Sequence, residues 1–134
     1  TLEFWHVDLA AYPGWKRPDL SVEEVSQIRS CLEGLMQALA PVRLHFGWRT
    51  VSDVLEYANL FRAQQPSQPL TRVLDQVSYA RVLRTLRGSS SLRLEKALEK
   101  VQGVLLQYDL QRSRAKVGEL LDDLREQGSM RFWR

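Results

Sequence analysis

Arg49 is the residue whose type and position point most directly to chemistry in this chain. It lies in the stretch "HFGWRT" (residues 45–50), directly before the helical pattern "VSDVLEYANLF". The spacing predicts a helix that begins at Thr50, with Asp53 three residues later in the arrangement of a capping box. Arg49 would then stand beside free backbone N–H groups, and a guanidinium together with such groups suits a phosphate anion. The simpler alternative is a solvated charge at a helix end.

Two neighbours would support this arginine. Gly47 permits an unusual backbone angle before the helix, and Trp48 is large enough to anchor the loop in the core. His45 is better explained as a packed or surface imidazole than as a catalytic base. Arg49 is therefore the candidate phosphate sensor, with Gly47, Trp48 and Thr50 as its supporting loop.

Arginines also crowd the following predicted helix and the turn after it. They are Arg72, Arg81, Arg84, Arg87 and Arg93. Solubility and pairing within the helix would explain some of them, although Arg84 and Arg87 have few acidic residues at the spacing that such pairs need. The other explanation is an anionic partner, such as nucleic acid, a nucleotide or the acidic surface of a sister domain. Arg81, Arg84 and Arg87 are the candidate contacts for it.

Motifs for free-standing catalysis or metal binding are missing from the sequence. None of the seven glycines is followed by lysine, so there is no phosphate loop of the form G-x-x-x-x-G-K-[ST], and no G-x-G-x-x-G occurs. His6 and His45 lie far apart, and the single Cys31 completes no zinc-binding spacing. Cys31 is expected to be a buried, inert thiol. We therefore predict no catalytic residue and no metal ligand within this chain.

Five amphipathic helices are expected to position these residues. Ser21 and Glu24 form a capping box at the start of the first helix, whose apolar stripe is Val22, Val25, Ile28, Leu32, Leu35 and Leu39. Gly88 and Gly128 are expected to stop the third and fifth helices. The helices are predicted over residues 21–40, from Thr50 to the "QQPSQP" segment at 64–69, and over residues 70–87, 91–108 and 110–127.

These elements predict one all-α domain, a compact bundle of about five helices with short extended segments at the two ends. Residues 1–20 are expected to be a loop-rich lead-in, residues 21–127 the helical bundle, and residues 128–134 an extended tail. The length of 134 residues suits one domain with a real core. The chain begins without a methionine, which leaves open that it is a piece of a larger protein.

Composition narrows the class of protein further. The chain is 44% hydrophobic and 26% charged, as in ordinary folded proteins, and its net charge of +3 is well below that of a dedicated nucleic-acid binder. No apolar run approaches the length of a membrane span. The single cysteine fits a reducing compartment, so we expect a cytoplasmic protein without membrane contact.

Three separated segments resemble one family, the McrB-like branch of AAA+ ATPases. "FGWRTVSDVLEYANL" resembles the second-sensor region of that branch, in which an arginine stands at a helix start. "LDQVSYARVLRTLRGSSSLRLEKALEKV" resembles its pattern of an early Leu-Asp, a turn ending in Gly-Ser and a leucine-rich helix. "LDDLREQGSMRFWR" is similar to its chain end, a helix followed by Phe-Trp-Arg.

The resemblance implies that this chain is the C-terminal helical lid of an AAA+ NTPase, inactive by itself. Arg49 would be the second-sensor arginine, which contacts the terminal phosphate of ATP or GTP held with Mg²⁺ by a core domain before Thr1. The implied partners are that core and the neighbouring subunits of an oligomeric ring, with a nuclease and DNA in a restriction system. The resemblance leaves open whether Arg49 acts on its own or a neighbouring subunit's nucleotide.

Two other readings remain. One is a stand-alone module that binds nucleic acid through the arginines of the third helix. The other is a protein-interaction bundle that uses the aromatic ends of the chain around Trp5, Trp15 and Trp133. The isolated chain is expected to be inactive and to hold no cofactor.

Overall fold

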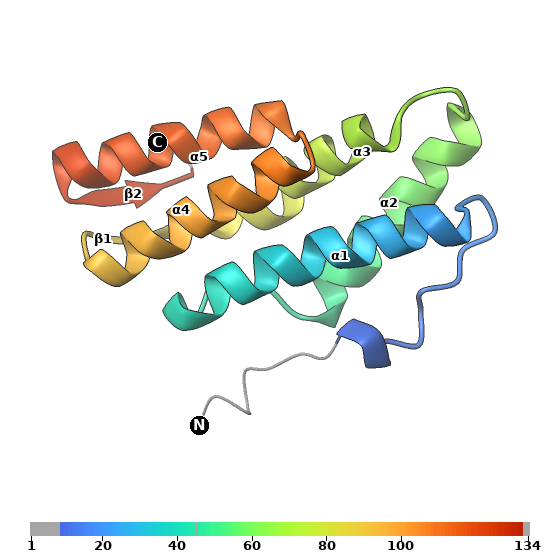
Figure 1. Cartoon of the computed structure of the whole chain (residues 1–134), viewed down its shortest axis with the longest axis horizontal. Coiled ribbons are helices and arrows are strands. Elements are labelled where there is room, and N and C mark those ends of the chain that lie inside the picture. Colours follow the sequence, from blue (N-terminus) through green and yellow to red (C-terminus); the bar gives the residue numbers. More distant parts are fainter. Residues whose placement is uncertain (1–8, 45, 133–134) are drawn as a thin grey trace.

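The structure of the chain is a computed structural model that describes residues 9–44 and 46–132. Five α-helices form its body, and two short antiparallel strands lie at one end of the bundle (Figure 1). The helices are α1 (Val22–Leu39), α2 (Trp48–Gln64), α3 (Leu70–Val77), α4 (Leu92–Gln107) and α5 (Gln111–Gln127), and the strands are β1 (Arg87–Ser89) and β2 (Ser129–Arg131). The predicted all-α fold is confirmed, with a small sheet added to it.

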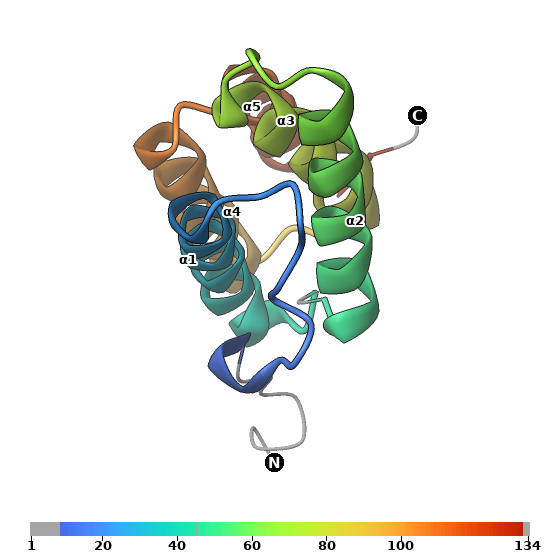
Figure 2. The same cartoon turned by 90° about the vertical axis from the view of Figure 1, so that its right-hand side faces the viewer.

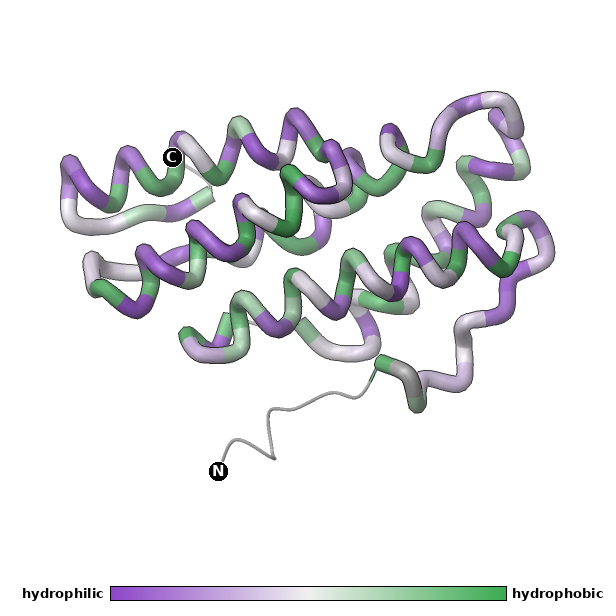
Figure 3. Tube along the Cα trace, in the orientation of Figure 1, coloured by the Kyte–Doolittle hydropathy of each residue, from purple (hydrophilic) through white to green (hydrophobic). Residues whose placement is uncertain are grey.

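The helices pack side by side around one core. α4 lies between α1 and α5, while α2 packs against α3. Viewed from the end, α1 and α4 stand opposite α2, and α3 and α5 close the space between them (Figure 2). Apolar residues recur along each helix at the spacing of an amphipathic helix (Figure 3). The buried apolar side chains form one cluster that runs from Leu9 to Phe132.

α1 begins where the sequence predicts. The Ser21 hydroxyl accepts a hydrogen bond from the Glu24 N–H at 3.1 Å, and the Glu24 carboxylate accepts one from the Ser21 N–H at 3.1 Å, so the capping box is complete. Val22, predicted to open the apolar stripe, is instead 87% exposed. The first turns of α1 extend beyond the end of α4 (Figure 1), so α4 does not cover this end of α1.

The start of α2 was predicted incorrectly. The helix begins at Trp48 and has Gly47 at its N-cap, so Thr50 lies inside the first turn and caps nothing. The first helical hydrogen bond runs from the Val51 N–H to the Gly47 carbonyl oxygen at 3.3 Å. Phe46 and Val51 are both buried, at the two positions that a hydrophobic staple joins. The helix start therefore follows the burial of these two apolar side chains, and the Thr50–Asp53 pair does not determine it.

The third helix is shorter than predicted. α3 ends at Val77, a wider π-helical turn spans Ser78–Val82, and a 3-10 turn follows over Leu83–Thr85. The chain then becomes strand β1, so Gly88 does not stop a helix. Val82, Leu83 and Leu86 are still buried, which shows that the apolar spacing was right although the helix was not continuous. After these two turns the chain continues into β1, which pairs with the C-terminal strand.

The two strands join distant parts of the chain. β1 pairs with β2 in antiparallel register, with Gly88 opposite Met130. Gly88 has a φ of +154°, and a Cβ atom at this residue would lie 2.8 Å from Leu94 Cδ2. Met130 and Phe132 are buried against the core, so the tail that was expected to be extended is also packed. Gly128 ends α5 in the left-handed conformation, as predicted.

The lead-in joins α1 to α2. Leu9 and Leu20 are buried, and the Tyr12 hydroxyl is hydrogen-bonded to the Ser52 hydroxyl on α2. The Asp19 N–H donates to the Asn59 side-chain oxygen at 2.9 Å, farther along the same helix. This predicted loop is therefore part of the folded body.

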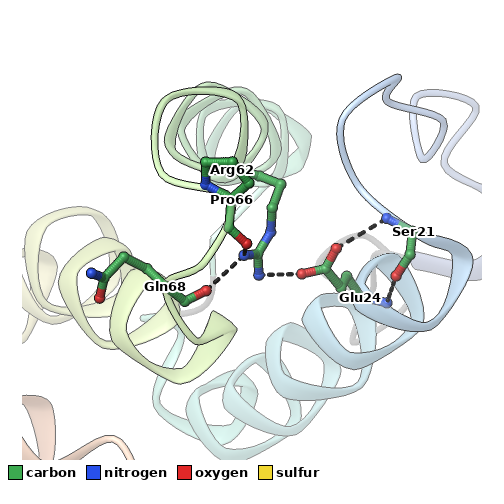
Figure 4. A network of polar contacts seen from close by, with 5 residues as sticks. All are labelled: Ser21, Glu24, Arg62, Pro66 and Gln68. Atoms are coloured by element: carbon green, nitrogen blue, oxygen red, sulfur yellow. Dashed lines mark hydrogen bonds and ion pairs between the residues drawn. The ribbon is translucent and has the colours of Figure 1, made fainter.

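A polar cluster joins α1, α2 and the loop after α2 (Figure 4). Arg62 pairs with the carboxylate of Glu24, the same residue that completes the capping box. Its Nη1 donates to the carbonyl oxygens of Pro66 at 2.9 Å and Gln68 at 2.6 Å. One guanidinium therefore connects two helices and closes the loop between α2 and α3.

Candidate functional site

Arg49 lies on the first turn of α2, and its side chain is exposed. It is the second residue of the helix, whereas the sequence placed it one residue before the helix. No acidic residue lies in this first turn, and no side chain caps it. The backbone N–H groups of Trp48, Arg49 and Thr50 therefore have no acceptor within the helix. Among the described residues, none forms a hydrogen bond or ion pair with the Arg49 guanidinium.

The electrostatics of this helix start favour an anion. The helix dipole places partial positive charge at the first turn, so a cation at this position is repelled by its own helix. An oxyanion between the guanidinium and the free N–H groups would be attracted by both. The planar guanidinium can hold two oxygens of a phosphate group at once. The arrangement can bind a phosphate chemically, and it offers no group that could act as a nucleophile or base.

The supporting loop differs in part from its prediction. Gly47 precedes the helix in an extended conformation, at φ −104°, so it does not use a backbone angle reserved for glycine. Trp48 was expected to anchor the loop in the core, but it is 45% exposed and packs its ring against Tyr12 at a centroid distance of 5.7 Å. Phe46 fills the core position instead, because it is the residue that precedes the N-cap.

The three arginines predicted to contact an anionic partner lie in three different secondary-structure elements. Arg81 lies in the π-helical turn, Arg84 in the 3-10 turn and Arg87 on β1, and all three are exposed. Arg87 lines a pocket, together with Arg43 and Arg93. The sequence could not group Arg87 with Arg43, because residues so far apart in the chain have no local signal that they line the same pocket.

Cys31 is the buried thiol that the sequence predicts. It has no exposed surface, and burial raises the pKa of its thiol from 9.0 to about 12. Burial also raises the pKa of Tyr108, while a hydrogen bond with Ser30 opposes this shift. A thiol that stays protonated at neutral pH is a poor nucleophile. Cys31 is therefore part of the core.

Some predicted features fall outside the part of the chain that the structure describes. His6, His45, Trp5 and Trp133 are among them, so the suggested meeting of the aromatic chain ends lies outside the described residues. Within residues 9–44 and 46–132, no group of three histidine, cysteine or acidic side chains could hold a metal ion. No helix in these same ranges combines the length and apolar character needed to cross a membrane.

Comparison with known proteins gives one match. Residues 8–129 match the family described as "Domain of unknown function (DUF8727)". Neither a curated protein nor a solved structure matches the chain.

Proposed function

The chain belongs to the DUF8727 family. We propose that it is the C-terminal lid of an AAA+ NTPase of the McrB-like kind, and the support for this is its sequence resemblance to that branch and the position of Arg49. In this proposal Arg49 contacts the terminal phosphate of ATP or GTP, which a core domain binds with Mg²⁺. The lid holds no catalytic group of its own. Its motion on phosphate release is transmitted to the core and to neighbouring ring subunits, which in a restriction system act with a nuclease on DNA.

The position of Arg49 is the observation that carries the proposal. An exposed guanidinium stands on the first turn of a 17-residue helix, beside N–H groups that no side chain caps. A sensor needs a side chain that reaches out of its own domain, since the nucleotide is bound by another. A buried Arg49 would have contradicted this role.

The packing of the chain gives secondary support. The segments that resemble the McrB-like branch meet in one body, because β1, within the "LRGSS" turn, pairs with β2 in the C-terminal tail. Asp75, from the early Leu-Asp, accepts hydrogen bonds from the start of α5, which leads into that tail. A lid that moves as one piece needs such connections between elements that are far apart in the chain, here α3 and α5.

The chemical contribution of Arg49 would be positioning and charge stabilisation. Phosphoryl transfer spreads negative charge over the phosphate oxygens, and a fixed guanidinium stabilises that charge. Loss of the contact after hydrolysis would release the lid from the nucleotide. Either the subunit's own nucleotide or that of a ring neighbour fits this role.

The sequence that precedes Thr1 in the parent protein provides the first test. We expect a phosphate loop of the form G-x-x-x-x-G-K-[ST] there, at the distance from a lid that AAA+ proteins show. A parent without any nucleotide-binding motif would rule the proposal out.

Turnover of the parent protein provides the second test. Arg49→Ala should lower kcat for ATP or GTP about 100-fold, as removal of one charge-stabilising donor does in other enzymes. Arg49→Lys should recover part of the loss, because it keeps the charge but not the two-pronged geometry. Arg114→Ala is the matched control, since Arg114 is an exposed arginine on α5. Unchanged turnover in Arg49→Ala would remove Arg49 from its role.

A further inference from the structure

A second group of arginines surrounds a pocket at the end of the bundle where β1 lies (Figure 1). The pocket has a volume of about 330 Å³ and lies between the turn after α1, strand β1 and the start of α4. Its lining residues are Pro41, Val42, Arg43, Leu44, Arg87, Gly88, Ser89, Ser91, Arg93 and Leu94. Arg49 is not among them, so this pocket is separate from the proposed sensor.

Three positive charges line the pocket without compensation. Arg43, Arg87 and Arg93 are exposed, and among the described residues none forms an ion pair with them. Within residues 9–44 and 46–132, no acidic side chain belongs to the lining. Glu95 is close in sequence to Arg93, but its carboxylate is directed to Arg125 on α5, 3.9 Å away. The pocket therefore carries a concentrated positive charge.

The strand register adds a fourth charge beside the pocket. Arg87 stands directly opposite Arg131 of β2, and both side chains are exposed. Like charges that face each other across two strands destabilise the pair. A bound anion would remove this repulsion.

Arg43 has a backbone conformation that few side chains adopt. Its φ is +59°, in the left-handed region, where the chain turns out of the helical end of α1. Glycine is the usual residue at such a helix end, since a side chain there costs free energy. Arg43 therefore places a guanidinium at the pocket although its backbone conformation is less favourable for arginine than for glycine.

The start of α4 adds hydrogen-bond donors to the same pocket. Ser91 caps this helix by accepting a hydrogen bond from the Leu94 N–H at 3.1 Å, while the N–H groups of Leu92 and Arg93 have no acceptor within the helix. Partial positive charge from the helix dipole reinforces the three arginines. All these features favour one kind of ligand, a small group with several negative charges.

We propose that Arg43, Arg87 and Arg93 form a binding site for a polyphosphate group. The pocket is at the small end of the range for ligand sites, which suits a di- or triphosphate and excludes a nucleic-acid duplex. Among the described residues that line it there is no aromatic side chain on which a base could stack. The site recognises phosphates by charge and geometry. The polyphosphate group that binds there belongs either to free polyphosphate or to the phosphate chain of a nucleotide.

Calorimetric titration of the purified chain tests the site. Tripolyphosphate should bind in the pocket at least tenfold more tightly than inorganic phosphate, because it carries more negative charge and more oxygens to pair with the three guanidinium groups. Arg43→Gln, Arg87→Gln and Arg93→Gln should each weaken tripolyphosphate binding about tenfold, whereas Arg114→Gln should leave it unchanged. Equal weakening in Arg114→Gln, or no saturable binding of tripolyphosphate, would overturn the proposal.

Two further variants separate this site from folding and from the sensor. Arg43→Gly should weaken tripolyphosphate binding while raising the Tm, because glycine accepts the left-handed backbone without strain. A lower Tm in this variant would mean that Arg43 is structural and would count against the site. Arg49 does not line the pocket. Tripolyphosphate binding that is lost in Arg49→Gln but kept in the Arg43, Arg87 and Arg93 variants would place the site at the start of α2 and overturn this proposal.

Titration with ATP and AMP identifies the source of the phosphates. Binding of ATP as tight as that of tripolyphosphate assigns the site to nucleotides, and binding of ATP at least tenfold weaker assigns it to free polyphosphate. AMP should bind no better than phosphate in either case. Binding of AMP as tight as that of ATP would show that the base, rather than the phosphate chain, is recognised, and would contradict the proposal.

Discussion

The Asp75 side chain of α3 caps the start of α5 through Ser113. One carboxylate oxygen accepts a hydrogen bond from the Ser113 N–H at 2.8 Å, and the other accepts one from the Arg112 N–H at 2.9 Å. The Ser113 hydroxyl returns a hydrogen bond to the Asp75 carbonyl oxygen at 3.0 Å. Leu110, the residue at the N-cap of α5, provides no side-chain cap, so a residue from another helix takes over this function.

Removal of this carboxylate should destabilise the chain. Asp75→Ala leaves two N–H groups at the start of α5 without an acceptor, and the free energy of unfolding should fall by about 2 kcal/mol. Ser113→Ala should cost about 1 kcal/mol, because it removes one buried hydrogen bond. Urea unfolding measures both losses. Asp122→Ala, an exposed residue of the same helix, is the control and should change stability by less than about 0.5 kcal/mol.

Arg62 should contribute more to stability than a surface arginine does. Arg62→Met removes the contact with Glu24 and two hydrogen bonds to the loop after α2, and we expect a loss of about 2 kcal/mol in thermal or urea unfolding. Arg29→Gln breaks the ion pair with Glu33, whose side chains are both 41% exposed, and should cost less than about 0.5 kcal/mol.

A charge-only variant separates the two functions of Glu24. Glu24→Gln keeps a side chain that can complete the capping box with Ser21, while it removes the charge that faces Arg62. A double-mutant cycle of Glu24→Gln with Arg62→Met then measures their coupling. Independent effects of the two substitutions would contradict the ion pair seen in the structure.

Two glycines in neighbouring helices should respond differently to alanine. A Cβ atom at Gly103 of α4 meets nothing within 4 Å, so Gly103→Ala should raise the free energy of unfolding by about 0.5–1 kcal/mol through helix propensity. A Cβ atom at Gly34 of α1 would lie 3.1 Å from Val104 Cγ1, where α1 and α4 pack closely. Gly34→Ala should therefore gain less than Gly103→Ala. Equal Tm gains would show that this helix contact is looser than described.

The buried thiol should make stability depend on alkaline pH. The pKa of Cys31 is about 12 in the folded chain against 9.0 as its ordinary value, so above pH 9 the unfolded chain releases the thiol proton first. Stability is then lost as pH rises from about 9 to 12, by about 1.4 kcal/mol per pH unit. Below pH 9 the thiol contributes no pH dependence. Urea unfolding at a series of pH values measures this slope.

Cys31→Ala isolates the contribution of the thiol. Tyr108 also has a raised pKa and contributes in the same range, so the informative quantity is the difference in slope between the two proteins. The variant should be less stable at pH 7, but its stability should fall less steeply above pH 9. Identical slopes would mean that the thiol is reached by water in the folded chain.

Short-range signals located much of the fold. The pair of Ser21 and Glu24, the serine before α4 and Gly128 after α5 each act within a few residues, and the helices begin or end beside them. Their hydrogen bonds join neighbours in the chain, which is why the pattern of residue types is sufficient to predict them. α2 shows the limit of this reasoning, because burial of Phe46 competed with the local pair at Thr50 and determined the start of the helix.

The candidate sites illustrate the same limit. Arg49 could be selected because its neighbours in the sequence define the helix start. Arg43 could not be selected from the sequence. It lines a pocket with Arg87 and Arg93 only because the turn after α1 packs beside β1 and α4 in the folded chain. The contacts of Arg62 could not be predicted from the sequence either, because its partners lie in α1 and in the loop after α2.

By itself, the sequence determined the helical class, most helix boundaries, the inert cysteine and one candidate phosphate contact. These depend on periodicity and on hydrogen bonds between near neighbours. The tertiary structure decided the break after α3, the pairing of the two strands, the cap that Asp75 places on α5 and the pocket of three arginines. Each of those joins residues far apart in the chain, where packing of side chains overrides local preference.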